Sequence, residues 1–229
     1  FVAEDIFSAH MAEGVPWRSM AVIGRARSDI PLITRALNRA GVPVVVGTDE
    51  IALKDEPAVQ VLLGLISLAA RPQQSTAADV SDLLTGPICG FDASEMRRIG
   101  RVLRTSQPNV SSPELIRELI IGVGSANTVP GELGARVKAI TGLITLIRSE
   151  IENHKPVTDI LWTAWSGDPK YPHGWPQRLQ EAALGHSASA HHDLDSIIAL
   201  FDTATRFSDR TNAGIDNFLN QLKYQNLPA

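Results

Sequence analysis

The sequence contains a single cysteine, Cys89, among its 229 residues, so no disulfide can form within the chain. One cysteine in a chain of this length is typical of a reducing compartment, and we expect a cytoplasmic protein. No apolar run approaches the roughly 20 residues that a membrane-spanning helix needs. The N-terminal segment FVAEDIFSAH is acidic and lacks the basic start of a signal peptide. We therefore expect a soluble chain with no membrane partner.

An excess of positive charge is also lacking. The formal net charge is -4, and the isoelectric point is about 5.9. Proteins that bind nucleic acid with their whole surface are strongly basic, which excludes that description here. Any contact with a nucleic acid must therefore come from local clusters of basic residues.

The glycine patterns of nucleotide-binding loops are missing. None of the lysines follows a glycine, so the sequence has no P-loop. Gly24 stands alone where a dinucleotide-binding loop needs three glycines, and Asp29 would place a negative charge at the same helix start. The residues present therefore predict no bound ATP, magnesium or other cofactor in this chain.

Metal-binding and catalytic patterns are missing as well. The run His191-His192-Asp193, with Asp195, lacks the H-x-x-x-H spacing that brings two histidines to one ion. We expect these residues to be polar groups at a helix start. Cys89 has no C-x-x-C partner and lies in an apolar turn, which favours a small buried side chain over a nucleophile. We thus expect no metal site and no catalytic residue.

The only signal for parallel β-structure lies near the N-terminus. A helical pattern over 2–13 is followed by a predicted strand at 20–23, a helix from Ser28 to Ala40 and a second strand at 44–46. A strand, a helix and a strand within about 30 residues form a βαβ unit with parallel strands. We therefore predict a small α/β piece at the start of the chain.

The rest of the chain is predicted to be helical, so the fold class is mostly α: a small α/β piece followed by an all-helical subdomain. A shift in composition near 85–91 indicates a boundary between domains spanning 1–86 and 87–229. Asp92-Ala-Ser-Glu95 resembles a capping box, and Ser112-Pro113-Glu114 combines an N-cap, a proline and an acidic first turn. The helices are expected at 57–70, 76–84, 93–105, 113–121, 131–153, 157–165, 175–184, about 191–209 and 214–223.

The helix predicted over 93–105 has an arginine-rich face. Its buried stripe is expected to consist of Met96, Ile99 and Leu103. Four arginines lie outside that stripe: Arg97, Arg98, Arg101 and Arg104. The first, third and fourth of them are spaced at i, i+4 and i+7, which places them on one face. Two interpretations of this face are open. The arginines could contact the phosphates of a nucleic acid, or they could form a solvated face in a chain of negative net charge.

A second basic feature is the turn in IGRARSD, where Arg25 and Arg27 follow the first predicted strand. The carboxyl ends of parallel strands are the usual ligand-binding edge of an α/β sheet. A solvated surface turn is the alternative explanation for two arginines at this position. The residues themselves leave both interpretations open.

Three segments, taken in order, resemble the C-terminal half of UvrD/Rep-type superfamily I DNA helicases: AVIGRARSDIPLITRALNRAGVPVVVG, DEPAVQVLLGLISLAARP and LLTGPICGFDASEMRRIGRVLR. That family has the same succession of an AVLxR strand, a helix, a GIPxxxxG segment, a helix beginning near E-[IP] and a glycine-containing turn. Three later segments resemble actinobacterial UvrD-like proteins more specifically, including subunits of the AdnA/AdnB helicase–nuclease: DILWTAWSGD, GWPQRLQEAALG and HHDLDSIIALFDTATRFSDR.

The resemblance implies a place within a longer helicase polypeptide. Residues 1–86 would be part of the second motor lobe (2A), and 87–229 the helical auxiliary subdomain (2B) that is inserted into that lobe. The P-loop, the acidic DExx-type motif and the arginine finger would lie outside this stretch, which begins without methionine. We therefore expect a non-catalytic part of an enzyme for DNA unwinding and repair, with ATP and magnesium bound elsewhere in the parent protein.

The resemblance also implies partners and contact residues. The partners would be single-stranded or forked DNA, the rest of the helicase polypeptide and a second helicase–nuclease subunit. Arg25 matches the arginine of AVLxR and Arg27 lies near a neighbouring polar position, at an edge that meets single-stranded DNA. Thr85, Gly86 and Gly90 fall near a turn resembling the family's G-I-G element, which meets duplex DNA through backbone amides. The segment GPICGF departs from the compact G-I-G spacing of that element.

A protein-interaction module that docks a partner subunit is the alternative function. The loop WSGDPKYPHGW is rich in aromatic and apolar residues, as docking surfaces are. We expect the tryptophans in and near this loop to pack in the core rather than to stack on bases: Trp162, Trp165 and Trp175.

Overall fold

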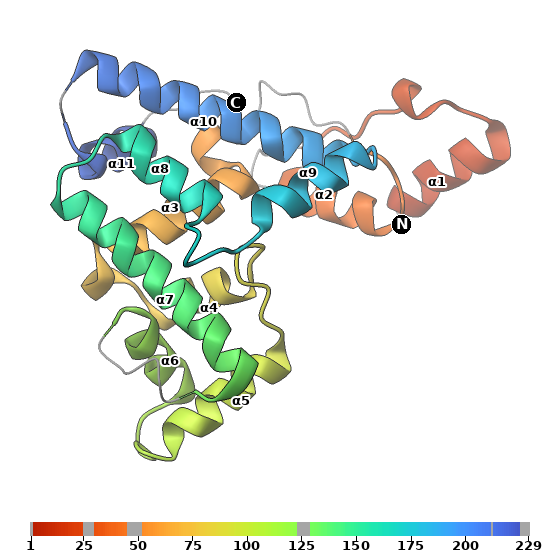
Figure 1. Ribbon diagram of the computed structural model, residues 1–229. Coiled ribbons are helices and arrows are strands. Elements are labelled where there is room, and N and C mark those ends of the chain that lie inside the picture. Colours follow the sequence, from red (N-terminus) through yellow and green to blue (C-terminus); the bar gives the residue numbers. More distant parts are fainter. Residues whose placement is uncertain (1, 25–29, 45–51, 123–128, 212, 225–229) are drawn as a thin grey trace. The chain divides into compact units, whose positions relative to one another are not determined.

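The computed structural model describes residues 2–24, 30–44, 52–122, 129–211 and 213–224. The chain divides into two compact units, residues 1–51 and residues 52–227, which we describe one at a time. Within the described ranges every regular element is a helix, and there is no β-strand (Figure 1). The prediction of a mostly helical chain is thereby confirmed.

The first unit contains two α-helices, α1 (Val2–Glu13) and α2 (Ile30–Arg39), and a short 3-10 turn at Trp17–Ser19. None of the residues of α1 is buried. Among the described residues of this unit only Leu37 and Val42 are buried. The unit therefore has almost no hydrophobic core of its own.

The predicted βαβ unit is not found. Residues 20–23 form no strand, and the side chain of Ile23 is 93% exposed. Most of the second expected strand, 44–46, lies outside the described residues. An apolar run becomes a strand only where a neighbouring strand satisfies its backbone N–H and C=O groups, and no described residue of this unit offers such a neighbour. The helix predicted between the two strands is present as α2.

The second unit is a succession of helices. Two 3-10 turns, Leu53–Asp55 and Pro72–Gln74, precede and follow the first of its α-helices. The α-helices are α3 (Pro57–Ala70), α4 (Ala77–Thr85), α5 (Ala93–Arg104), α6 (Ser112–Ile120), α7 (Gly131–Glu152), α8 (Val157–Ser166), α9 (Trp175–Leu184), α10 (Ala188–Arg210) and α11 (Ile215–Tyr224). Every helix that the sequence predicts for this part of the chain is present, with small shifts at the ends.

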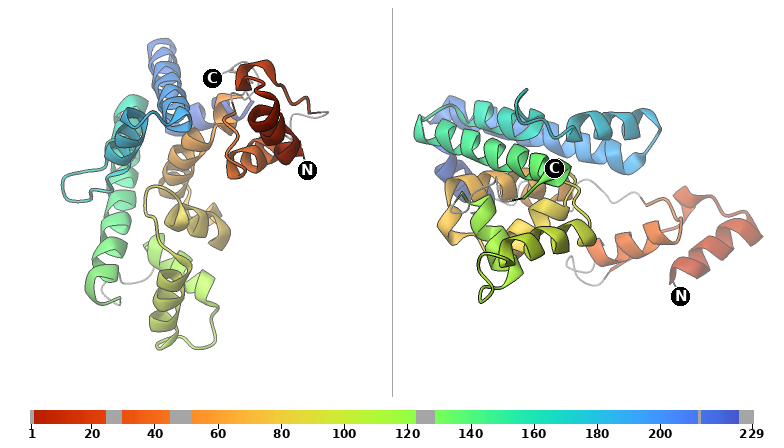
Figure 2. Two further views of the ribbon diagram at one scale, coloured as in Figure 1. Left: turned by 90° about the vertical axis from the view of Figure 1, so that its right-hand side faces the viewer. Right: turned by 60° about the horizontal axis from the view of Figure 1, so that its bottom comes forward.

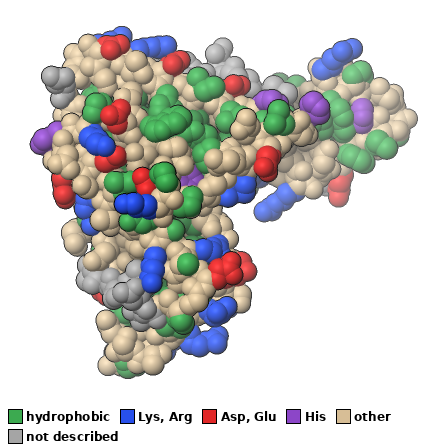
Figure 3. Space-filling model, in the orientation of Figure 1, with side chains coloured by type: hydrophobic (Ala, Val, Ile, Leu, Met, Phe, Trp, Pro, Cys, Tyr) green, Lys and Arg blue, Asp and Glu red, His purple; other side chains and the backbone are tan. Residues whose placement is uncertain are grey.

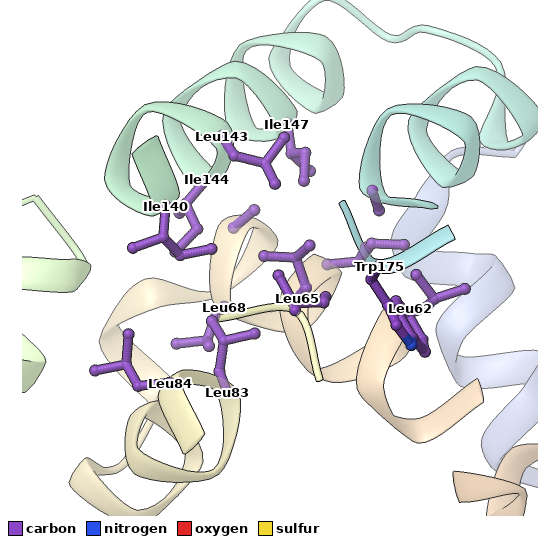
Figure 4. Packing of buried hydrophobic residues seen from close by; sticks show 14 of the residues in the cluster. Leu62, Leu65, Leu68, Leu83, Leu84, Ile140, Leu143, Ile144, Ile147 and Trp175 are labelled. Atoms are coloured by element: carbon purple, nitrogen blue, oxygen red, sulfur yellow. The ribbon is translucent and has the colours of Figure 1, made fainter. Parts of the chain in front are cut away.

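Helix α3 is the centre of this unit. Its sequence PAVQVLLGLISLAA is apolar except for a narrow exposed stripe of Gln60, Gly64 and Ser67, and the apolar sides of such a helix are buried by its neighbours. Helices α4, α7, α8 and α10 contact it. In Figure 4, Leu65 and Leu68 of α3 lie among buried side chains of α7 and α4: Ile140, Leu143, Ile144 and Ile147, and Leu83 and Leu84.

Helices α4, α5 and α6 form a group in which α6 contacts both of the others. The capping box predicted at the start of α5 is present, because the N–H of Glu95 donates to the Asp92 carboxylate and the N–H of Asp92 donates to the Glu95 carboxylate. The N-cap of α6 is Ser111, one residue before the predicted one. Gly100 lets α5 approach α6 closely, since a Cβ at Gly100 would lie 2.6 Å from the Cβ of Ser112.

Helices α8, α9 and α10 form a second group, in which α10 lies alongside both of the others (Figures 1 and 2). The loop between α8 and α9 turns its tryptophans inward: Trp165 and Trp175 meet edge to face with 5.0 Å between ring centroids, and Trp175 is buried. Tyr171 packs on α7, where a side chain at Gly142 would collide with its ring. The prediction of core packing is right for Trp175 and wrong for Trp162, which is exposed.

The two ends of this unit contact each other. The Lys54 ammonium group donates a hydrogen bond to the backbone oxygen of Lys223 at 2.8 Å. Arg71, just after α3, forms an ion pair with Asp216 of α11, with 2.7 Å between Nη2 and Oδ1. These contacts bring the last helix back to the beginning of the unit.

The boundary predicted between residues 86 and 87 falls inside the second unit. Helix α4 ends at Thr85 and contacts both α3 and α6, so residues on the two sides of that boundary pack together. The assignment of 1–86 and 87–229 to two subdomains of a helicase stays a prediction. In the part of the chain that the structure describes, no helix is long and apolar enough to cross a bilayer.

Replacing Leu62 with alanine should strongly destabilise the second unit. The side chain of Leu62 is fully buried in α3, and truncating such a leucine lowers the free energy of unfolding by about 2–5 kcal/mol because a cavity remains. Chemical denaturation followed by circular dichroism measures the change. The matched control is Leu184→Ala, whose side chain is 75% exposed and whose truncation should change that free energy by less than about 0.5 kcal/mol. Equal effects of the two substitutions would contradict the central position of α3.

Candidate nucleic-acid interface

The four arginines of α5 are all exposed. On the inner side of the helix Ile99 and Leu103 are buried and Met96 is partly buried, as its amphipathic pattern predicts. On the outer side lie Arg97, Arg98, Arg101 and Arg104. Figure 3 shows Lys and Arg side chains gathered on the lower right, where α5 lies in Figure 1. The predicted arginine-bearing face is present, while its role in binding stays a prediction.

Three of these arginines line one groove: Arg97, Arg101 and Arg104. Arg98, on the same helix, does not line it. The groove has a volume of about 710 Å³ and lies between α5, α4 and the start of α6. Its remaining lining residues are apolar or carry a hydroxyl group: Ala77, Ser81, Met96, Thr105, Pro108, Ser112, Pro113 and Ile116. Three guanidinium groups thus border a hollow that contains no carboxylate.

The guanidinium groups of α5 are not held by other side chains that the structure describes. None of the four forms an ion pair or a side-chain hydrogen bond with another described residue. Other arginines of this unit bind carboxylates or backbone carbonyls: Arg71, Arg117, Arg136, Arg148 and Arg178. The donors of the α5 arginines therefore remain available to an anionic ligand, for which the planar guanidinium is well suited.

The charge of this face also affects the cap of α5. The backbone N–H of Glu95 holds the pKa of the Asp92 carboxyl below its usual value, and Arg97 and Arg136 add smaller effects of the same sign. Asp92 accepts hydrogen bonds from the N–H groups of Ser94 and Glu95 at 2.7 Å. Its carboxylate is therefore committed to capping the helix.

The turn between α4 and α5 contains the other predicted contact residues of this unit. The hydroxyl of Thr85 donates to the backbone oxygen of Ser81 at 2.9 Å, and the N–H of Gly90 donates to the oxygen of Gly86 at 2.8 Å. Gly90 has a φ of 60°, a left-handed conformation that favours glycine. The expected amide contact with duplex DNA stays a prediction, and Gly90 would have to give up its bond within the turn to make it.

Two arginines that no sequence motif singles out hold this turn. Arg136 of α7 donates to the backbone oxygen of Cys89 at 2.8 Å and pairs with Glu95 at 2.5 Å. Arg178 of α9 donates to the backbone oxygen of Pro87. These bonds to the turn join residues 47 and 91 positions apart, so no local pattern could have predicted them.

The predicted contact residues do not form one site. A cavity of about 660 Å³ beside the turn is lined by Thr85, Gly86 and Gly90. The groove of about 710 Å³ is lined by Arg97, Arg101 and Arg104. Outside the described residues lie Arg25 and Arg27. Contact between these last two arginines and single-stranded DNA stays a prediction.

Cys89 lies in the turn with its thiol packed against the hydrophobic core. Burial raises the pKa of the thiol to about 12, and the charges of Arg136 and Arg178 only partly oppose that rise. The thiolate is the nucleophilic form of cysteine, and it is nearly absent at neutral pH. These surroundings fit a small packed side chain and not a nucleophile.

Alkylation of Cys89 should therefore be slow in the folded chain. At pH 8 a thiol with a pKa of about 12 is ionised to the extent of roughly one part in ten thousand. Mass spectrometry after timed exposure to iodoacetamide measures the rate, which should increase as the pH rises. The same chain unfolded in urea is the control and should react at the rate of an ordinary thiol. Equal rates in the two states would show that the raised pKa is wrong.

A hydrogen-bonded pair with a buried carboxylate involves one of the consecutive polar residues at 191–193. Nε2 of His192 on α10 is 2.8 Å from Oε2 of Glu56, which precedes α3 and is almost fully buried. Burial raises the pKa of the adjacent Asp193 carboxyl; the charge of His192 opposes the rise and that of Glu56 adds to it. No group of three or more His, Cys, Asp or Glu among the described residues could hold a metal ion. The pair instead joins α10 to α3 across 136 residues.

Replacing His192 with alanine should lower the stability of the second unit. The substitution leaves the Glu56 carboxylate buried without its hydrogen-bond partner, and an unsatisfied buried polar group costs about 1–3 kcal/mol. Urea unfolding followed by circular dichroism measures the loss. His191→Ala removes an exposed neighbouring histidine and should have an effect below about 0.5 kcal/mol. If both variants unfold at the urea concentration of the parent chain, the pair contributes nothing.

The chain is similar to helicase–nuclease subunits of Streptococcus pneumoniae. It is 24% identical over 169 residues to an ATP-dependent helicase/nuclease subunit of strain Hungary19A-6. It has the same identity over the same length to the exonuclease/helicase subunit RexA of serotype 4 strain ATCC BAA-334 / TIGR4. Each match covers 72% of this chain and 13% of the relative. No family model matches the chain.

The chain thus resembles a part of helicase/nuclease subunits. It spans 13% of the length of the curated relatives that it matches, so their names describe much longer proteins. The similarity supports the UvrD-like superfamily as the level of relationship. The more specific resemblance to actinobacterial proteins gains no support from it and stays a prediction.

Proposed function

We propose that this chain is a non-catalytic, DNA-contacting part of an ATP-dependent helicase of the UvrD-like superfamily I, acting in the cytoplasm in DNA unwinding and repair. Similarity to helicase/nuclease subunits supports the parent activity. ATP and magnesium would be bound by other parts of that protein, because this sequence contains no P-loop. The contribution of this chain would be to contact DNA and to regulate the motor.

The exposed apolar side chains of the first unit support its place within a larger assembly. Six of them are large: Val2, Phe7, Met11, Val22, Ile23 and Leu32. So many exposed large apolar side chains, beside only two buried residues among those described in this unit, are unusual for a unit that folds on its own. We propose that the rest of the helicase polypeptide covers them, with residues 1–86 as part of motor lobe 2A and 87–229 as subdomain 2B. A second helicase–nuclease subunit is the further proposed partner.

The arginine groove of α5 is the observation that carries DNA contact. A guanidinium binds a phosphate through paired, charge-assisted hydrogen bonds. No carboxylate lines the groove, and Arg97, Arg101 and Arg104 form no ion pair with a described residue. No aromatic side chain lines the groove, so it offers no platform on which a base could stack. These features favour contact with the sugar–phosphate backbone of single-stranded or forked DNA.

Replacing Arg97, Arg101 and Arg104 together with glutamine should weaken DNA binding and flatten its dependence on salt. The slope of log K against log salt is negative, and each lost contact with a duplex phosphate reduces its magnitude by about 0.9. The loss of three contacts should therefore reduce the magnitude by about 2.7. Fluorescence anisotropy of a labelled forked DNA, titrated at several salt concentrations, measures the slope. All three side chains are exposed, so circular dichroism should show an unchanged fold.

The single variants Arg101→Gln and Arg98→Gln form the matched pair for this experiment. They remove the same charge from the same helix, but only Arg101 lines the groove. We expect Arg101→Gln to lower the slope by about 0.9 and Arg98→Gln to leave it nearly unchanged. An unaltered slope in the triple variant, or equal effects of the two single variants, would refute the groove as the site of DNA contact.

A further inference from the structure

A solvent-exposed tryptophan on α8 marks a surface that DNA contact does not use. Trp162 is 60% exposed, and Ile198 of α10 is 59% exposed. Phe201 of α10 meets Trp162 edge to face, with 6.2 Å between the ring centroids. Ile198 and Phe201 are three residues apart on a helix and therefore neighbours. We refer to Trp162, Ile198 and Phe201 as the aromatic patch.

The aromatic patch lies on the two adjacent helices α8 and α10. Figure 3 shows hydrophobic side chains gathered in the upper part of the view, where these helices run in Figure 1. The edge-to-face contact with Phe201 restricts the orientation of the Trp162 ring. Tryptophan is among the residues most enriched where a few side chains carry most of the energy of protein association. An exposed tryptophan whose ring is already oriented loses little conformational freedom when a protein binds to it.

Acidic side chains surround the aromatic patch. Asp159 lies one helical turn before Trp162 on α8, and Asp195 and Asp202 lie one turn on either side of Ile198 on α10. All three carboxylates belong to exposed residues. None of them forms an ion pair with a described residue, but Lys155 is a cationic neighbour of Asp159, since its raised pKa is due chiefly to Glu150 and to a smaller extent to Asp159. We refer to Asp159, Asp195 and Asp202 as the acidic rim. Its charge is opposite to that of the arginine groove.

We propose that the aromatic patch and the acidic rim dock an amphipathic helix of a partner protein, one that carries a large apolar anchor flanked by lysine or arginine. The carboxylates of the rim repel the phosphates of nucleic acids and attract basic side chains. An apolar helix face laid on exposed aromatic side chains is a common form of peptide recognition. The docking surface is thus placed on α8 and α10 rather than on the loop WSGDPKYPHGW, whose tryptophans pack inward.

Two labelled helical peptides test this proposal on the full 229-residue chain. Both carry leucines at i, i+3 and i+4 spacing with one central tryptophan; the first has lysine and the second glutamate on the polar face. Fluorescence anisotropy measures their binding. We expect the lysine peptide to bind and the glutamate peptide not to bind over the same range of concentration. Trp162→Ala should weaken binding of the lysine peptide at least about tenfold.

The controls separate the patch from general attraction between charges. Asp195→Asn combined with Asp202→Asn should weaken the lysine peptide's binding and reduce its dependence on salt. Leu184→Ala, which truncates an exposed apolar side chain outside the patch, should leave it unchanged. The triple glutamine variant of the arginine groove should also retain peptide binding, so failure of this proposal and failure of DNA contact can be told apart.

Several results would overturn the proposal. Failure of the lysine peptide to bind, equal binding of the glutamate peptide, or undiminished binding to Trp162→Ala would each do so. Sedimentation that detects a dimer which Trp162→Ala abolishes would also overturn it, because a second copy of the chain would then occupy the patch. Loss of DNA binding in Trp162→Ala would assign the surface to nucleic acid instead.

Discussion

Helix α3 has only a narrow exposed stripe, formed by Gln60, Gly64 and Ser67, and the arrangement of the second unit depends on covering its apolar sides. Four helices contact α3, and each presents an apolar side to it, as α7 does with Ile144 and Ile147. Only the outward faces of the covering helices, and the helices one layer further out such as α5, remain available for ligands. The exposed arginines of α5 and the aromatic patch of α8 and α10 both occupy such outward positions.

Charged groups follow different rules inside and outside this core. Buried carboxylates are paired: Glu56 with His192 at 2.8 Å and Glu150 with Lys155 at 2.9 Å. Burial without a counter-charge would be costly for either group. The arginines of α5 and the carboxylates of the acidic rim are hydrated, so they need no partner for stability. The net charge of -4 is thus the sum over a surface that includes a basic region, the arginine groove, and an acidic one, the acidic rim. Each is suited to a different kind of partner.

Features that depend on a few neighbouring residues could be predicted from the sequence. The capping box of Asp92 and Glu95 and the i, i+4, i+7 arginine face of α5 are of this kind, because helix geometry alone determines them. The prediction of a strand at 20–23 was wrong, because a strand depends on a partner strand that can be far away in the chain. The hydrogen bond from Arg136 to the turn joins residues that are distant in the sequence, and so does the pair of Glu56 and His192. No local pattern could therefore predict these contacts. Hydrophobicity likewise could not separate exposed Trp162 from buried Trp175.

The contact between Lys54 and Lys223 has a topological consequence. A helical unit whose first and last segments meet can be inserted into a surface loop of another fold, because the host chain is interrupted over only a short distance. The ion pair between Arg71 and Asp216 is a second link of this kind, and it would help to keep the two connections to such a host close together.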